Sequence, residues 1–136
     1  MKYIIHKNHT NNSVTVIIPS GELSIEEVLI KDCPKDAFIV DKSDLPNFDE
    51  FFDAWELNNK TVSVNINKAK EITKKRLRIE RKELLEEQDI LFQRNLENNI
   101  DNSIVISEKQ RLRDITKLVD ETNTLEELKK IKVSKE

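Results

Sequence analysis

The side chains best able to do chemistry in this chain are those of two histidines and one cysteine. His6 and His9 have a His-x-x-His spacing that could place two imidazoles on one metal ion. They stand among turn-forming asparagines without further ligands at a metal-binding spacing, so we expect loop polarity here. Cys33 is the only cysteine, which excludes an intrachain disulfide, and the adjacent Pro34 predicts that its thiol lies in a loop.

The glycine content excludes several common catalytic motifs. Gly21 is the only glycine, so a GxGxxG dinucleotide loop, a Walker A loop and a GxSxG nucleophile elbow are all absent. The sequence also lacks a recognisable constellation of acid, base and nucleophile. We therefore predict a protein that is not an enzyme, with no catalytic residue, no cofactor and no metal, acting through contacts with other proteins.

Composition favours an extended helical protein over a compact enzyme. The 136 residues are 37% hydrophobic and 36% charged, with a net charge of −3 and few aromatic residues. Such a chain buries only a modest core, as one small domain with an appended helical part. No signal peptide, membrane-spanning run or lipidation motif is recognised, so we expect the protein to work in a cytoplasm and not in a membrane.

We predict an α+β fold in which residues 1–64 form a small β-rich head. β-Branched runs at 2–5 and 13–18 flank a polar turn, which predicts a β-hairpin. Three side chains of its second strand share one face, which we expect to be buried: Val14, Val16 and Ile18.

The rest of the head is predicted from turn and capping signals. Ser24 and Glu27 form a capping box, which predicts one short helix over 25–31. A short strand is expected at 37–40, and another at 61–64 after a hairpin turn that includes Leu57, Asn58 and Asn59.

Most of the aromatic residues gather within eight positions of the head: Phe48, Phe51, Phe52 and Trp55. One interpretation is that they anchor the core of the head. The other is that Phe51, Phe52 and Trp55 form an exposed docking patch for a partner.

Residues 65–98 predict one long helix, because no glycine or proline interrupts them. Asn65 and Asn67 can each cap its start, and Asn98 and Asn99 can end it in a left-handed conformation. A helix of this length is about 50 Å long, which is more than a small domain needs.

This helix carries two apolar stripes. The main stripe, expected to face the chain's own core, consists of Leu77, Leu84, Leu85, Leu91 and Phe92, with Ile66 at its start. Ile72, Ile79 and Ile90 fall on nearly the opposite side. They are either covered by other parts of the same chain or buried between subunits, and we predict a homo-oligomer of about two or three chains through this second stripe.

Charge is also segregated along the helix. Positions 68–82 hold eight basic and two acidic residues, and Glu83, Glu86, Glu87 and Asp89 follow. Nucleic-acid binding is one interpretation, but aromatic and amide side chains are not interleaved with the basic run and the chain is net acidic, so we do not expect it. A solvated face, or antiparallel pairing of the basic half with the acidic half, fits the pattern better.

The remaining residues predict a helical return, so that 65–136 is a helical hairpin. Capping boxes at Ser107 and Thr124 each predict the start of a helix. The first of these helices should lie antiparallel on the long one. Its expected apolar face consists of Leu112, Ile115, Leu118 and Val119.

Several segments together resemble a family of small proteins encoded in the tail modules of tailed phages and prophages, near tail-fibre genes. The segments that carry the resemblance are 16–22, 39–41 with 44–46, 52–56, 64–72, 84–85, 109–114 and 124–129. They cover nearly the whole chain, although Asn65 and Asn67 depart from the family pattern. The resemblance contributes no catalytic motif.

The resemblance implies a non-enzymatic tail structural or assembly protein, whose partners are phage tail or tail-fibre proteins. It would be found in the host cytoplasm during assembly and, as a particle component, in the virion tail. Two alternatives stay open: a transient chaperone that leaves before the particle is complete, and a regulator that binds nucleic acid through its basic helix.

Overall fold

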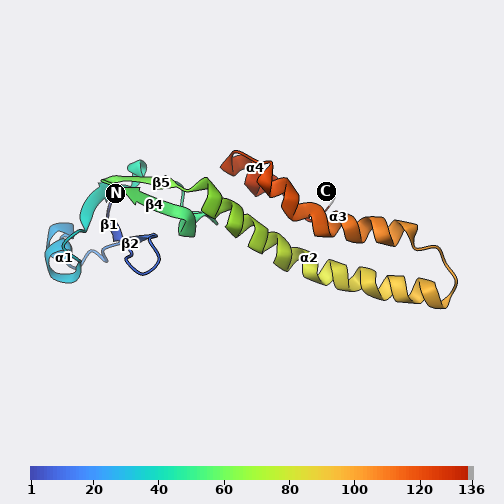
Figure 1. Cartoon of the computed structure of the whole chain (residues 1–136). Coiled ribbons are helices and arrows are strands. Elements are labelled where there is room, and N and C mark those ends of the chain that lie inside the picture. Colours follow the sequence, from blue (N-terminus) through green and yellow to red (C-terminus); the bar gives the residue numbers. More distant parts are fainter. Residues whose placement is uncertain (135–136) are drawn as a thin grey trace. The chain divides into compact units, whose positions relative to one another are not determined.

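The computed structural model describes residues 1–134, and the chain divides into two compact units, Met1–Lys68 and Ala69–Glu136. Antiparallel strands come first, and a long helix with two further helices follows (Figure 1). This is the predicted α+β class.

The first unit contains a three-stranded antiparallel sheet in the order β2-β1-β3. Its strands are β1 (Lys2–Lys7), β2 (Val14–Ile17) and β3 (Phe38–Asp41), and Ile4 of β1 pairs with residues of both neighbours. The predicted hairpin is confirmed, with Val14 buried. Ile18 is not on the buried face as predicted: it lies beyond the end of β2 and is 61% exposed. The strand ends there because Pro19 has no N–H to continue the ladder.

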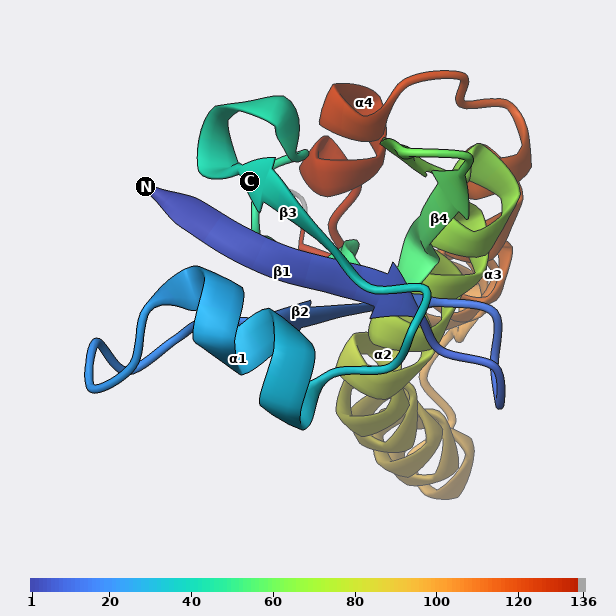
Figure 2. The same ribbon diagram turned by 90° about the vertical axis from the view of Figure 1, so that its left-hand side faces the viewer.

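Helix α1 (Ile25–Asp32) packs against β1 and β3 (Figure 2). The predicted cap is confirmed, since the Ser24 hydroxyl accepts a hydrogen bond of 3.2 Å from the Glu27 N–H. Two short 3-10 turns, η1 (Lys42–Asp44) and η2 (Phe52–Ala54), follow later in the chain.

A second sheet consists of β4 (Trp55–Asn58) and β5 (Thr61–Val64). The turn is tighter than predicted, because Leu57 belongs to β4 and pairs with Val62, and of the two candidate asparagines only Asn59 has a positive φ, of 57°. Four buried side chains from the two sheets form an apolar cluster in the core of this unit: Ile5, Val14, Trp55 and Val62.

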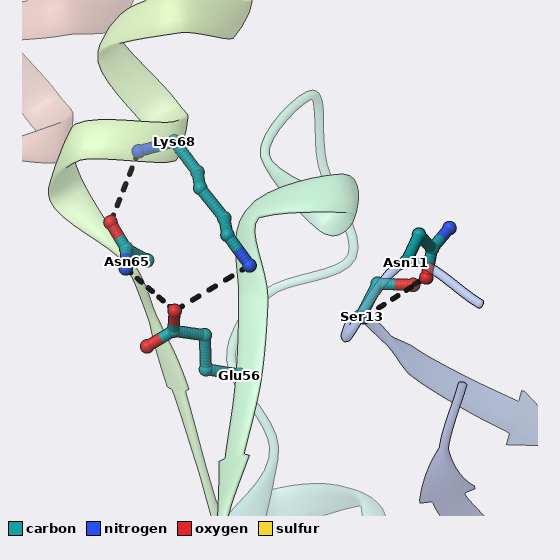
Figure 3. A network of polar contacts seen from close by, with 5 residues as sticks. All are labelled: Asn11, Ser13, Glu56, Asn65 and Lys68. Carbon is teal, nitrogen blue, oxygen red and sulfur yellow. Dashed lines mark hydrogen bonds and ion pairs between the residues drawn. The ribbon is translucent and has the colours of Figure 1, made fainter. Parts of the chain in front are cut away.

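Helix α2 (Ile66–Glu97) begins and ends as predicted. The Asn65 side-chain oxygen accepts a hydrogen bond of 3.1 Å from the Lys68 N–H, and Asn99 has a φ of 55°. Glu56 of β4 accepts a bond of 2.6 Å from the Asn65 amide and lies 3.5 Å from the Lys68 ammonium (Figure 3). The cap is therefore held in place by the preceding hairpin.

In the second unit, α3 (Ser103–Asp120) returns beside α2 (Figure 1), and the short α4 (Leu125–Lys130) follows. The predicted cap at Thr124 is confirmed by a bond of 3.2 Å from the Glu127 N–H. The helix start predicted from the capping box at Ser107 is wrong, because the N-cap of α3 is Asn102, five residues earlier. Asn102 ties this earlier start to α2: its side chain accepts a hydrogen bond from the Asn95 amide and donates one to the main-chain carbonyl of Phe92.

The core of the second unit follows the facing sides of these helices. Its buried residues include Ala69, Thr73 and Leu77 of α2, Val105, Leu112, Ile115 and Val119 of α3, and Leu128 and Val133 beyond them. Leu91 and Leu118, predicted to lie in this core, are 42% and 48% exposed. For Leu118 the helical geometry gives the reason: it lies about 120° around the helix from Leu112, whereas Val119 returns to within about 20°.

Candidate functional site

For the charges of α2 the sequence favoured a solvated face or antiparallel pairing, and the second unit shows which charges have partners within the hairpin. Arg81 donates to the main-chain carbonyls of Leu112 and Arg113 of α3, at 3.3 and 2.9 Å. Arg76 reaches the C-terminal end of α4, where it bonds to the carbonyls of Leu128 and Ile131. Helix C-termini carry unsatisfied carbonyls and partial negative charge, so they suit an arginine.

Ion pairs also join α2 to α3, on the side of α2 that faces the rest of the hairpin. Lys74 lies 2.7 Å from Asp120, and Asp89 of the acidic half lies 2.6 Å from Lys109 of α3. Lys74 and Arg76 of the basic half thus meet the C-terminal ends of α3 and α4, whereas Asp89 of the acidic half meets a lysine in the first half of α3. Part of the charge segregation along α2 is explained by the hairpin itself.

The shifted pKa values in the described residues have structural causes. The hydrogen bond from Lys74 lowers the pKa of Asp120, and the bond from Gln110, followed by that from Lys117, lowers the pKa of Asp114. Burial, and then the charge of Asp32, raises the pKa of the Cys33 thiol, which keeps it in the less reactive protonated form.

The side of α2 opposite its contacts with α3 and α4 carries charges that the described part of the hairpin does not pair. We call it the outer face and define it by nine residues: Ile72, Lys75, Arg78, Ile79, Lys82, Glu83, Glu86, Glu87 and Ile90. Ile79 and Ile90 are 68% and 55% exposed, and Ile72 is half-buried. Within residues 1–134, none of the six charged side chains makes an ion pair or a side-chain hydrogen bond. The outer face is therefore an apolar stripe bordered by charge that the hairpin does not use.

The aromatic residues of the first unit are mostly internal. Phe51 and Trp55 are fully buried, which matches the core interpretation, and Phe52 is half-buried. Phe48 is 45% exposed and packs on Phe52 and Trp55, with ring centroids 6.0 and 5.0 Å away. Phe48 is the ring of this cluster that a partner could touch most easily, and the docking patch considered from the sequence did not include it.

A groove of about 690 Å³ lies between the edge strands β3 and β5. Phe38, Val40 and Val62 supply its apolar lining, and Lys60 stands at its side with its ammonium 5.9 Å from the Phe38 ring centroid. The sequence analysis missed this groove, because it is formed by two strands that are not neighbours in the chain.

The described residues contain neither a metal-binding cluster nor a membrane-spanning helix. Across residues 1–134, no group of three or more histidine, cysteine or acidic side chains is arranged to hold a metal ion. His9 instead lies 3.0 Å from Asp36, and His6 lies 3.1 Å from the main-chain carbonyl of Lys7. In the same part of the chain, no helix combines the length and apolarity needed to cross a membrane.

Comparison with protein-family models, curated proteins and solved structures finds no match for this chain. The candidate site is therefore defined by the chain's own geometry, and its best-supported part is the outer face of α2.

Proposed function

We propose that this chain is a non-enzymatic structural or assembly protein of a phage tail, which acts through contacts with tail or tail-fibre proteins. Its main structural support is the outer face of α2, where Ile79 and Ile90 are exposed between charges that have no partner within the described residues. Exposed isoleucines in one stripe, bordered by charge, are the composition of a helix seam. The tail assignment itself rests on the resemblance of the sequence segments given above.

The two units would have different roles. The second unit would join copies of the chain into a homo-oligomer through Ile72, Ile79 and Ile90. The first unit would dock on a larger tail or fibre protein, with the exposed Phe48 and the half-buried Phe52 as the accessible edge of its aromatic cluster.

The tail role is tested on particles of the phage or prophage that encodes the chain. Mass spectrometry of purified particles should detect the chain in a fixed ratio to a tail protein. If the chain is absent while its deletion yields particles without tails or fibres, the transient chaperone is the correct alternative. Normal, infectious particles after deletion would contradict both roles.

Self-association is tested separately by light scattering on the purified chain. Ile79→Lys should shift the protein toward monomer, because a charge would be buried in the seam. Ile104→Lys is the matched control, since Ile104 is 85% exposed but lies on α3. A wild-type monomer at tens of micromolar, or equal effects of the two substitutions, would contradict the seam.

The nucleic-acid alternative has less basic surface than the sequence suggested. Lys68, Lys74, Arg76 and Arg81 are engaged by Glu56, Asp120 and main-chain carbonyls. Binding to DNA or RNA at low salt that weakens steeply as salt is added would favour this alternative, and an absence of binding at low salt would remove it.

A further inference from the structure

The charges of the outer face are sorted by sign along the helix. Lys75, Arg78 and Lys82 lie in its N-terminal half, and Glu83, Glu86 and Glu87 follow directly. The hairpin makes no use of these six side chains within the described residues. Charges that are sorted by sign along an exposed helix favour one of the two orientations, parallel or antiparallel, in which a second helix can pack against it.

We propose that the occupant of the outer face is a second copy of this chain in antiparallel orientation, related by a two-fold axis near Leu84. A parallel copy would place lysines and arginine against their own equivalents, and glutamates against glutamates. An antiparallel copy with this axis instead places Lys82 of each chain against Glu86 of the other and keeps Lys75 and Arg78 away from their own equivalents. This orientation deepens the self-association proposed above and rests on it.

The isoleucines fit the same axis. Ile79 precedes Leu84 by five residues and Ile90 follows it by six, so their distances from the axis along the helix differ by only about 1.5 Å. They also lie within about 20° of each other around the helix. Each isoleucine therefore meets the other type on the partner, which gives one apolar contact on each side of the axis.

The same symmetry pairs specific charges. Lys82 and Glu86 lie two residues before and two residues after Leu84, and they are separated by about 40° around the helix. Each lysine then faces the glutamate of the second copy, and this contact occurs twice. An isologous interface of this kind closes as a dimer and does not extend into a filament.

Charge reversal tests the orientation. Lys82→Glu or Glu86→Lys alone should weaken the dimer about tenfold, because two attractive contacts become repulsive. The double variant should recover wild-type association, and a mixture of the two single variants should form heterodimers. Helix content measured by circular dichroism should be equal in all four proteins. Single variants that associate as strongly as wild type would overturn the antiparallel pairing.

Cysteine cross-linking gives an independent readout in a Cys33→Ser background. Lys75 and Gln93 lie nine residues on either side of Leu84, so they face each other across the proposed axis, whereas two copies of the same residue are about 27 Å apart. A mixture of Lys75→Cys and Gln93→Cys chains should form disulfide-linked dimers, and neither variant should do so alone. Self-cross-linking of either variant, or a monomeric wild type, would overturn the inference without bearing on the presence of the chain in particles.

Discussion

The guanidinium of Arg76 donates a hydrogen bond of 2.9 Å to the main-chain carbonyl oxygen of Ile131, the residue that ends α4. A second bond reaches the carbonyl of Leu128. One side chain thus joins the first half of α2 to the last helix of the chain. This contact makes the C-terminal helix part of the packed unit.

Arg76→Met should lower the free energy of unfolding of the second unit by about 1.5–3 kcal/mol, because charge-assisted hydrogen bonds to main-chain carbonyls are lost. Arg78→Met is the matched control, since Arg78 is exposed and lies on the outer face. It should change the free energy by less than about 0.5 kcal/mol. Urea unfolding followed by circular dichroism measures both, and equal effects would show that the Arg76 contacts contribute little.

Leu112→Ala should destabilise the second unit by about 2–5 kcal/mol, because it leaves a cavity in a fully buried position. Leu118→Ala removes the same atoms from a side chain that is 48% exposed. We expect Leu118→Ala to lower the free energy of unfolding by less than half as much as Leu112→Ala. The two midpoints of thermal unfolding make the comparison, and similar losses at both sites would contradict the described packing of α3.

Trp55→Ala should lower the free energy of unfolding of the first unit by about 3–5 kcal/mol, because the indole fills the core between the two sheets. Its Nε1 atom is buried and has no hydrogen-bond partner within the described residues. Trp55→Phe should therefore cost clearly less, since it keeps much of the ring volume and removes an unpaired N–H. Phe48→Ala, at a 45% exposed ring, is the control. Two-dimensional amide spectra report whether this unit stays folded in each variant.

The ion pair between Lys74 and Asp120 predicts a pH dependence. The folded state lowers the pKa of Asp120, so the pair stabilises the second unit above the aspartate's unfolded pKa of about 3.9. This contribution is lost as the pH falls through the lower, folded pKa. Wild type should therefore exceed Asp120→Asn in stability at neutral pH, and the difference should vanish in acid. Asp53→Asn, in an exposed residue of the first unit, is the control. A difference independent of pH would contradict a role for the charge.

Local chemistry was enough to predict where several elements begin and end. Ser24, Asn65 and Thr124 each cap a helix by accepting a bond from an N–H three residues later, and Asn99 takes the left-handed conformation that ends α2. These interactions span only a few residues, so the sequence contains both partners of each one.

The same local signal failed at Ser107, which lies inside α3. Its capping box resembles the one at Thr124, but Asn102 bonds to Asn95 and to the carbonyl of Phe92, and the helix already starts at Ser103. These contacts come from α2, so the sequence around Ser107 alone could not show which of the two possible start positions α3 uses.

The sequence by itself determined that α2 is one long helix with two apolar stripes and sorted charge. Only the tertiary structure decided which charges the chain uses: Arg81 bonds to carbonyls in α3, whereas Lys82, the next residue, has no partner within the described residues. Helical periodicity specifies the direction of each side chain around its own axis. Which segment occupies that direction depends on residues more than thirty positions away, and these meet α2 only when the hairpin closes.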